Sequence, residues 1–136
     1  VSSGIPIGDA VSNLNVYNVA ATGKALVFTY NFISEEFDQF VGSEFDDVFL
    51  AAVVETTQGS GRKGTTNIVN SVNRVGVDGS TPGTFPASFV GQQSGNLSGL
   101  IDISGLSPPL NLIFIVADLG DTIVDTVIMI DAVGFQ

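Results

Sequence analysis

Carboxylates are the side chains of this chain that could do chemistry, because ten of its fourteen acidic residues fall in two short segments beside apolar runs. Residues 33–49 read ISEEFDQFVGSEFDDVF, and residues 116–131 read VADLGDTIVDTVIMID. Two carboxylates about 5 Å apart repel each other by roughly 3 kcal/mol at an effective dielectric near 20. All four basic residues lie outside both segments. A divalent cation that prefers oxygen ligands, most simply Ca²⁺, would offset this repulsion. The ten acids are Glu35, Glu36, Asp38, Glu44, Asp46, Asp47, Asp118, Asp121, Asp125 and Asp131.

The second segment places Asp118, Asp121 and Asp125 around Gly120. Asp118 ends a predicted strand, Asp121 lies in the turn and Asp125 begins the next strand, so a chain that doubles back brings the three side chains together. The loop pattern and closing Glu of an EF-hand are absent, and the alternative is that Asp simply favours turns. Asp131 interrupts an apolar row, where a charge needs a partner or a cation unless a strand twist exposes it.

In the first segment Glu35 and Glu36 end one predicted strand, and Asp46 and Asp47 begin the next. Consecutive strand residues point to opposite faces, so we expect one residue of each pair to be a ligand. The other would face solvent or bond to backbone. We expect Glu36 and Asp47 to be the ligands. Taken over both segments, the candidate metal-binding residues are Glu35, Glu36, Asp46, Asp47, Asp118, Asp121 and Asp125.

The composition predicts one folded domain over residues 1–136. A net charge of -10 argues against nucleic acid and anionic membranes as partners. Hydrophobic residues make up 44% of the chain and charged residues only 13%, which excludes a disordered acidic tail. The absence of Cys, His and Trp removes thiol nucleophiles, the usual zinc sites and the Ser-His-Asp relay. Glycosidases also use paired carboxylates, but no further feature favours that reaction, so we expect no enzymatic activity.

Plentiful Val, Ile and Phe, together with Gly, Ser, Asn and Thr, predict an all-β domain with many turns. The clearest strand covers residues 25–33, where Leu26, Phe28 and Phe32 fall on one face. About eight strands at this spacing predict an antiparallel β-sandwich that is jelly-roll-like. The other expected strands cover residues 14–20, 47–55, 67–77, 97–103, 110–117 and 126–135.

The two acidic segments resemble the choice-of-anchor L domains of bacterial surface and secreted proteins. Those domains carry a motif like SEEY/F-x-x-F/Y-V-x-S-x-F-N/D-D-x-F and, nearer the C-terminus, I-A-D-x-G-D-x-x-x-D-S-x-V-x-I. The resemblance implies an extracellular, calcium-binding β-sandwich used in attachment or matrix building, with no established catalytic residues. Thr126 departs from it, because Ser is commoner there. The matching residues are Ser34, Glu35, Glu36, Phe37, Phe40, Val41, Ser43, Phe45, Asp46, Asp47, Phe49, Val116, Ala117, Asp118, Gly120, Asp121, Asp125, Val127 and Ile130.

These features together predict an extracellular or cell-surface calcium-binding module for bacterial adhesion, secreted and with its signal peptide already removed. Its ligand would be a peptide, a glycan or a neighbouring protein, and residues 56–66 and 78–95 are the loops expected to bind it. The alternative is a structural subunit that assembles with copies of itself into a pilus-like filament or a biofilm matrix fibre. Apolar residues 1–11 fit edge-to-edge or donated-strand assembly of that kind. The apolar runs are too short to cross a bilayer, so no membrane insertion is expected.

Overall fold

The computed structural model describes residues 11–36, 41–57, 59–75, 81–84, 90–118 and 126–136 of the protein. Most of these residues belong to β-strands, and the one helix among them is a single turn. The elements are β1 (Val11–Val19), β2 (Ala25–Ser34), β3 (Val48–Glu55), β4 (Gly64–Ser71), α1 (Val72–Val75), β5 (Thr81–Thr84), β6 (Val90–Asp102), β7 (Leu110–Ala117) and β8 (Thr126–Phe135).

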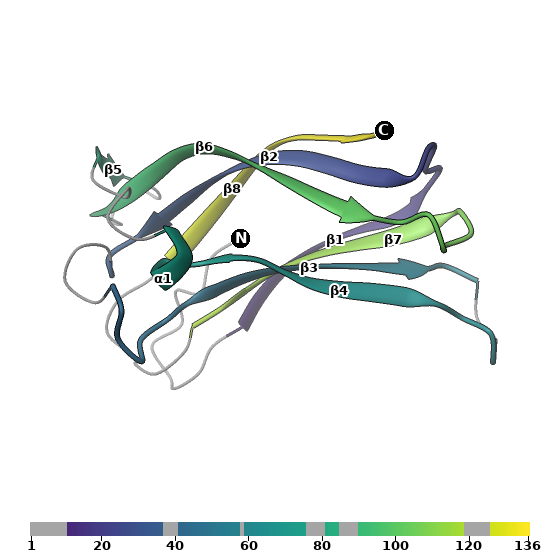
Figure 1. The fold of residues 1–136 in the computed structure, drawn as a ribbon, viewed down its shortest axis with the longest axis horizontal. Helices are drawn as coiled ribbons and strands as arrows, with labels where there is room; N and C mark the ends of the chain where they lie inside the picture. Colours follow the sequence, from purple (N-terminus) through teal and green to yellow (C-terminus); the bar gives the residue numbers. More distant parts are fainter. Residues whose placement is uncertain (1–10, 37–40, 58, 76–80, 85–89, 119–125) are drawn as a thin grey trace.

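The strands form two 4-stranded sheets, with the order β1-β7-β3-β4 in one and β5-β6-β2-β8 in the other. Neighbouring strands are antiparallel throughout both sheets. Figure 1 shows the sheets as two layers, with β2 and β6 on one side and β3, β4 and β7 on the other. Successive strands pass repeatedly from one sheet to the other, as in jelly rolls. The predicted antiparallel β-sandwich is therefore confirmed.

The core lies between the layers and is built on the alternation of β2. Phe28 and Phe32 face inward with Leu26 and Tyr30, and all four are buried. The ring of Phe28 contacts Phe114 of the opposite sheet edge-on, with ring centroids 5.4 Å apart, a favourable geometry for aromatic pairs. The alternation read from residues 25–33 thus identified the inward face of this strand correctly.

Strand β3 lies between β7 and β4 and has neighbours on both sides. Its inward side chains Phe49, Ala51 and Val53 are buried, and the outward Ala52 is 7% exposed. This agrees with the central position expected from a strand that is apolar on both faces. β3 and β4 are consecutive and pair as an antiparallel hairpin.

Two local predictions were wrong. Residues 72–75 form α1, although a strand was expected to continue to residue 77. The turn begins there because the Val72 amide donates to the carbonyl of Asp47 (3.0 Å) and the Asn73 amide donates to Asp46 Oδ1 (2.8 Å). Residues 81–84 form β5 and residues 90–95 belong to β6, although residues 78–95 were expected to be an irregular loop. Pairing with β2 stabilises the polar stretch of β6 as a strand despite its weak intrinsic preference.

No helix in the described part of the chain is long and apolar enough to span a membrane.

Candidate functional site

The buried polar side chains of the described residues gather at one end of the sandwich. β2 and β7 end there, while β3 and β8 begin there, as Figure 1 shows. Polar groups so far from water need compensating interactions, because burial removes their hydration. We call this region the acidic end. Its buried polar residues are Ser34, Glu36, Asp47, Ser71, Asp118 and Thr126.

Glu36 continues the inward row of β2 beyond the last strand residue. Phe32 and Ser34 occupy the preceding positions of this row, and both are completely buried, as is Glu36. The Glu36 amide donates to Ser34 Oγ (3.0 Å), and Thr126 Oγ1 of β8 donates to the same oxygen (2.8 Å). These bonds fix the backbone at Glu36 relative to β8 and direct its carboxylate into the interior.

Asp47 and Asp118 extend the ladder between β3 and β7 by one position at the acidic end. The last pair of this ladder is Val48 with Ala117, so the two aspartates lie opposite each other across neighbouring strands. Both follow the inward alternation of their strands, and they are 0% and 1% exposed. Directly opposite residues have Cβ atoms about 5 Å apart, a distance at which two like charges destabilise a sheet.

The acids next to these residues have other surroundings. Asp46 accepts a hydrogen bond from the Asn73 amide and so stabilises the first turn of α1. Glu35 is partly exposed, whereas Glu36 is buried. Within each acidic pair, the residue expected to point inward therefore does so, and Asp46 bonds to backbone. Metal ligation by Glu35, Glu36, Asp46 or Asp47 stays a prediction.

Asp131 does not belong to the acidic end. It is exposed and lies at a shift in the β2–β8 register between the Thr29 and Tyr30 pairs. A bulge of this kind turns a side chain away from the core, which is the strand-twist alternative considered from the sequence. A buried cation beside Asp131 is therefore not needed.

Three of the four basic residues lie at the opposite end of the sandwich. Lys24 precedes β2, and Arg62 and Lys63 precede β4. Arg74, the other one, is on α1 with an exposed side chain. Lys24, Arg62 and Lys63 thus lie a full strand length from the buried carboxylates.

Glu55 organises that opposite end of the sandwich. Its carboxylate accepts hydrogen bonds from the Ser107 amide (2.7 Å) and from the Lys63 amide (3.1 Å), and its carbonyl accepts one from Arg62 Nε (2.8 Å). The Ser107 and Lys63 amides lower the pKa of Glu55 below its usual 4.5. The expected recognition loop of residues 56–66 is thus tied to the end of β3.

The buried carboxylates offer the type of ligand atom that a hard cation binds, but they are too few to fill its coordination sphere. Both carboxylate oxygens of Glu36, one of Asp47 and one of Asp118 are buried, and carboxylate oxygen is the ligand that Ca²⁺ prefers. Within the residues that the structure describes, no three acidic side chains come close enough together to hold a metal ion. Asp121 and Asp125 lie outside the described residues. A calcium ion takes six to eight oxygens, so the buried carboxylates of the described residues do not by themselves complete a site.

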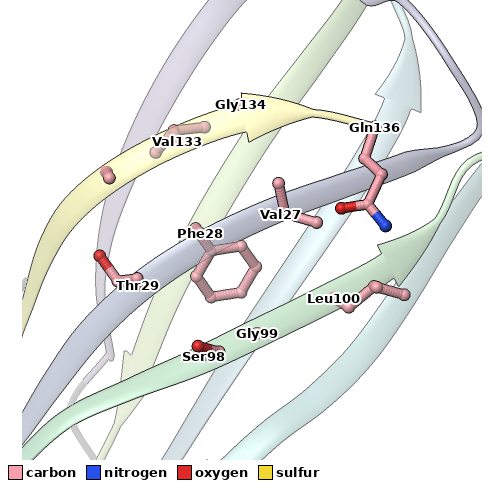
Figure 2. A pocket seen from close by; sticks show the side chains of 10 residues that line it. Val27, Phe28, Thr29, Ser98, Gly99, Leu100, Val133, Gly134 and Gln136 are labelled. Atoms are coloured by element: carbon pink, nitrogen blue, oxygen red, sulfur yellow. The ribbon is translucent and has the colours of Figure 1, made fainter.

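A second surface feature is a groove of about 510 Å³ over β2, β6 and β8. Figure 2 shows Val27 and Leu100 at one end of it and the ring of Phe28 beside Gly99, between β2 and β6. A side chain at Gly99 would overlap that ring, so the glycine makes room for Phe28. The groove is lined without a charged side chain by Val27, Phe28, Thr29, Ser98, Gly99, Leu100, Ala132, Val133, Gly134 and Gln136.

Sequence reasoning missed the hydroxyls of the acidic end. Ser34, Ser71 and Thr126 are buried there, and Ser34 receives two of the hydrogen bonds that orient the site. The only available signal was that Ser34 and Thr126 sit beside the acidic residues within the quoted motifs.

No protein-family model, curated protein or solved structure matches this chain. The resemblance to choice-of-anchor L domains therefore stays a prediction that depends on the two acidic motifs.

Proposed function

We propose that the domain binds Ca²⁺ at its acidic end and serves as an extracellular attachment module of a bacterial surface. The observation that carries the metal proposal is the burial of three carboxylates, from Glu36 of one sheet and from Asp47 and Asp118 of the other, where the inward rows of both sheets end. Asp121 and Asp125 follow Asp118 closely in sequence and would supply further oxygen ligands.

Electrostatics support a cation at this place. An ionised carboxylate is costly to bury unless an opposite charge or hydrogen bonds compensate it. Asp47 and Asp118 are both buried and face each other, so their ionised carboxylates repel each other. A divalent ion between β3 and β7 would offset this repulsion.

Calorimetry with and without a chelator tests the metal proposal. Ligand at a hundredfold its Kd stabilises a folded protein by about 2.7 kcal/mol, which for a domain of this size corresponds to a Tm change of roughly 10 °C. We expect the Tm to fall by this amount in EGTA and to return with millimolar Ca²⁺. Mg²⁺ at the same concentration is the matched control, because it demands a smaller octahedral site and should restore less. An unchanged Tm after EGTA would rule the site out.

The attachment role is supported by the motif resemblance and by the scaffold. A rigid sandwich presents loops and grooves whose side chains are free to recognise a ligand. The ligand would be a peptide, a glycan or a neighbouring protein. Peptide and glycan arrays probed in Ca²⁺ and again in EGTA test this role. Calcium-dependent binding would support an adhesion module, and absence of binding in both conditions would favour the structural alternative.

A further inference from the structure

Strand β1 is an edge strand that carries an unusual share of exposed apolar side chains. Val11, Leu14, Val16 and Tyr17 are 57%, 46%, 40% and 68% exposed. No other strand of the described residues exposes so many large hydrophobic side chains. The remaining ones are Ile68, Leu100, Met129 and Val133.

Two of these side chains point toward the interior, yet solvent reaches them. Leu14 pairs with Phe114 and Val16 pairs with Leu112, and cross-strand partners project from the same face of a sheet. Phe114 and Leu112 belong to the core. The other sheet ends with β8, which contacts β7 across the sandwich. β1 therefore extends beyond the layer that would cover it.

Within β1 itself, the outer edge carries none of the charges or prolines that usually protect an edge strand. Its sequence VSNLNVYNV contains no charged residue and no proline. The ladder with β7 is regular from Val11 to Val16, and the irregularity comes only afterwards, at Asn18, whose φ is 54°. Natural edge strands are blunted by charges, prolines or bulges, because their outward N–H and C=O groups otherwise pair with another strand.

We propose that this edge pairs with β1 of a second copy, antiparallel and about a two-fold axis at Leu14. This register sets Leu14 against its own equivalent on the inner face and Asn13 against Asn15 on the outer face. Asn15 Nδ2 already donates to Asn13 Oδ1 (2.8 Å) within one strand, so these amides lie in a position to bond across the pair. A two-fold interface uses the same patch on both copies, which suits a strand that is self-complementary in this way.

The charge distribution favours a second copy over another partner. Copies with a net charge of -10 repel each other in most orientations, and the uncharged β1 is a surface where they can approach. A basic partner would find no opposite charge on this strand. One strand pair buries less than the roughly 800 Å² per partner of a standard interface, so the dimer should be weak and reversible. This proposal does not depend on the calcium site.

Sedimentation velocity over a range of concentrations tests the interface. We expect the unchanged chain to show a monomer–dimer equilibrium. Leu14→Lys places two ammonium groups opposite each other and should raise the dimer Kd by about tenfold or more. Ile68→Lys is the matched control, because Ile68 is 51% exposed on β4, the other edge of the same sheet, and should leave the dimer unchanged. A monomer at every concentration, or equal effects of the two variants, would overturn the proposal.

Cross-linking tests the register even where a lysine variant fails to fold. The chain has no cysteine, so Leu14→Cys introduces a single thiol. The two-fold axis brings two such thiols within disulfide distance, and covalent dimers should form much faster than with Ile68→Cys. Equal rates would contradict the pairing. An unchanged Tm in EGTA would contradict the metal proposal. If the protein still forms dimers in EGTA, the β1 interface stands independently of that result.

Discussion

Asp47 and Asp118 face each other at the acidic end, one position beyond the last pair of the β3–β7 ladder. Both side chains point into the sandwich and are buried. Two ionised carboxylates at about 5 Å repel by roughly 3 kcal/mol at an effective dielectric near 20. A cation bound between them, as we propose, would offset this repulsion, and its effect on stability can be measured.

Asp118→Asn should stabilise the protein without calcium and destabilise it when calcium is added. In EGTA the amide removes one charge of the facing pair, so the variant should be more stable than the unchanged chain by about 1–3 kcal/mol. In millimolar Ca²⁺ the lost ligand should make the variant the less stable one. Urea denaturation in both conditions measures the two free energies of unfolding. The exposed Asp131→Asn serves as control, and an equal effect of Asp118→Asn in both conditions would count against a bound cation.

Gly99→Ala should destabilise the core through Phe28. The added methyl group would overlap the Phe28 ring, which is itself held against Phe114 at 5.4 Å and Phe49 at 6.1 Å. Overpacking of this kind costs about 1–3 kcal/mol. The cost should shrink in combination with Phe28→Leu, because neighbouring substitutions are not additive. Gly105→Ala, where an added methyl group meets no atom within 4 Å, is the control in the same denaturation series.

The inward position of Glu36 could be predicted from the sequence, because the strong alternation of β2 continues into the acidic segment. The facing pair of Asp47 and Asp118 could not, since it depends on the register of β3 with β7, strands far apart in the chain. Sequence patterns specify which residues share a face of one strand, but the choice of neighbouring strand comes from packing of the whole core.

The burial of Ser34 and Thr126 also escaped prediction. Ser and Thr occur in strands both on the solvent face and inside the sandwich, so the sequence does not show which of them are buried. Likewise, the turn at α1 arises from a bond between Asp46 and the Asn73 amide, which joins separate segments of the chain. Local propensity carries no information about such contacts, so residues 72–75 looked like a continuation of β4.

Tyr30→Phe should lower stability at neutral pH and make it less sensitive to alkali. Burial raises the pKa of Tyr30 above 10.0, and the hydrogen bond from Asn70 Nδ2 (2.9 Å) offsets this only in part. Because the folded-state pKa is the higher one, the contribution of Tyr30 is present below pH 10 and is lost as the pH rises further. Loss of the hydrogen bond should cost about 1 kcal/mol at pH 7. Denaturation at increasing pH should show the two curves converging above pH 10. Tyr17→Phe, at a side chain that is 68% exposed, is the control.

Glu55→Gln should flatten the loss of stability in acid. Amide hydrogen bonds from Ser107 and Lys63 lower the pKa of Glu55 below 4.5, its usual value. Because the folded-state pKa is the lower one, its stabilising contribution is present above pH 4.5 and is lost as the pH falls through the folded-state value. The glutamine variant keeps an acceptor but no charge, so its stability should be lower at pH 7 and should depend less on pH below 4.5. Urea denaturation from pH 7 to pH 3 measures both slopes. Glu44→Gln, at an exposed side chain, is the control, and a Glu55→Gln curve parallel to that of the unchanged chain would show that the two amides do not stabilise the ionised carboxylate.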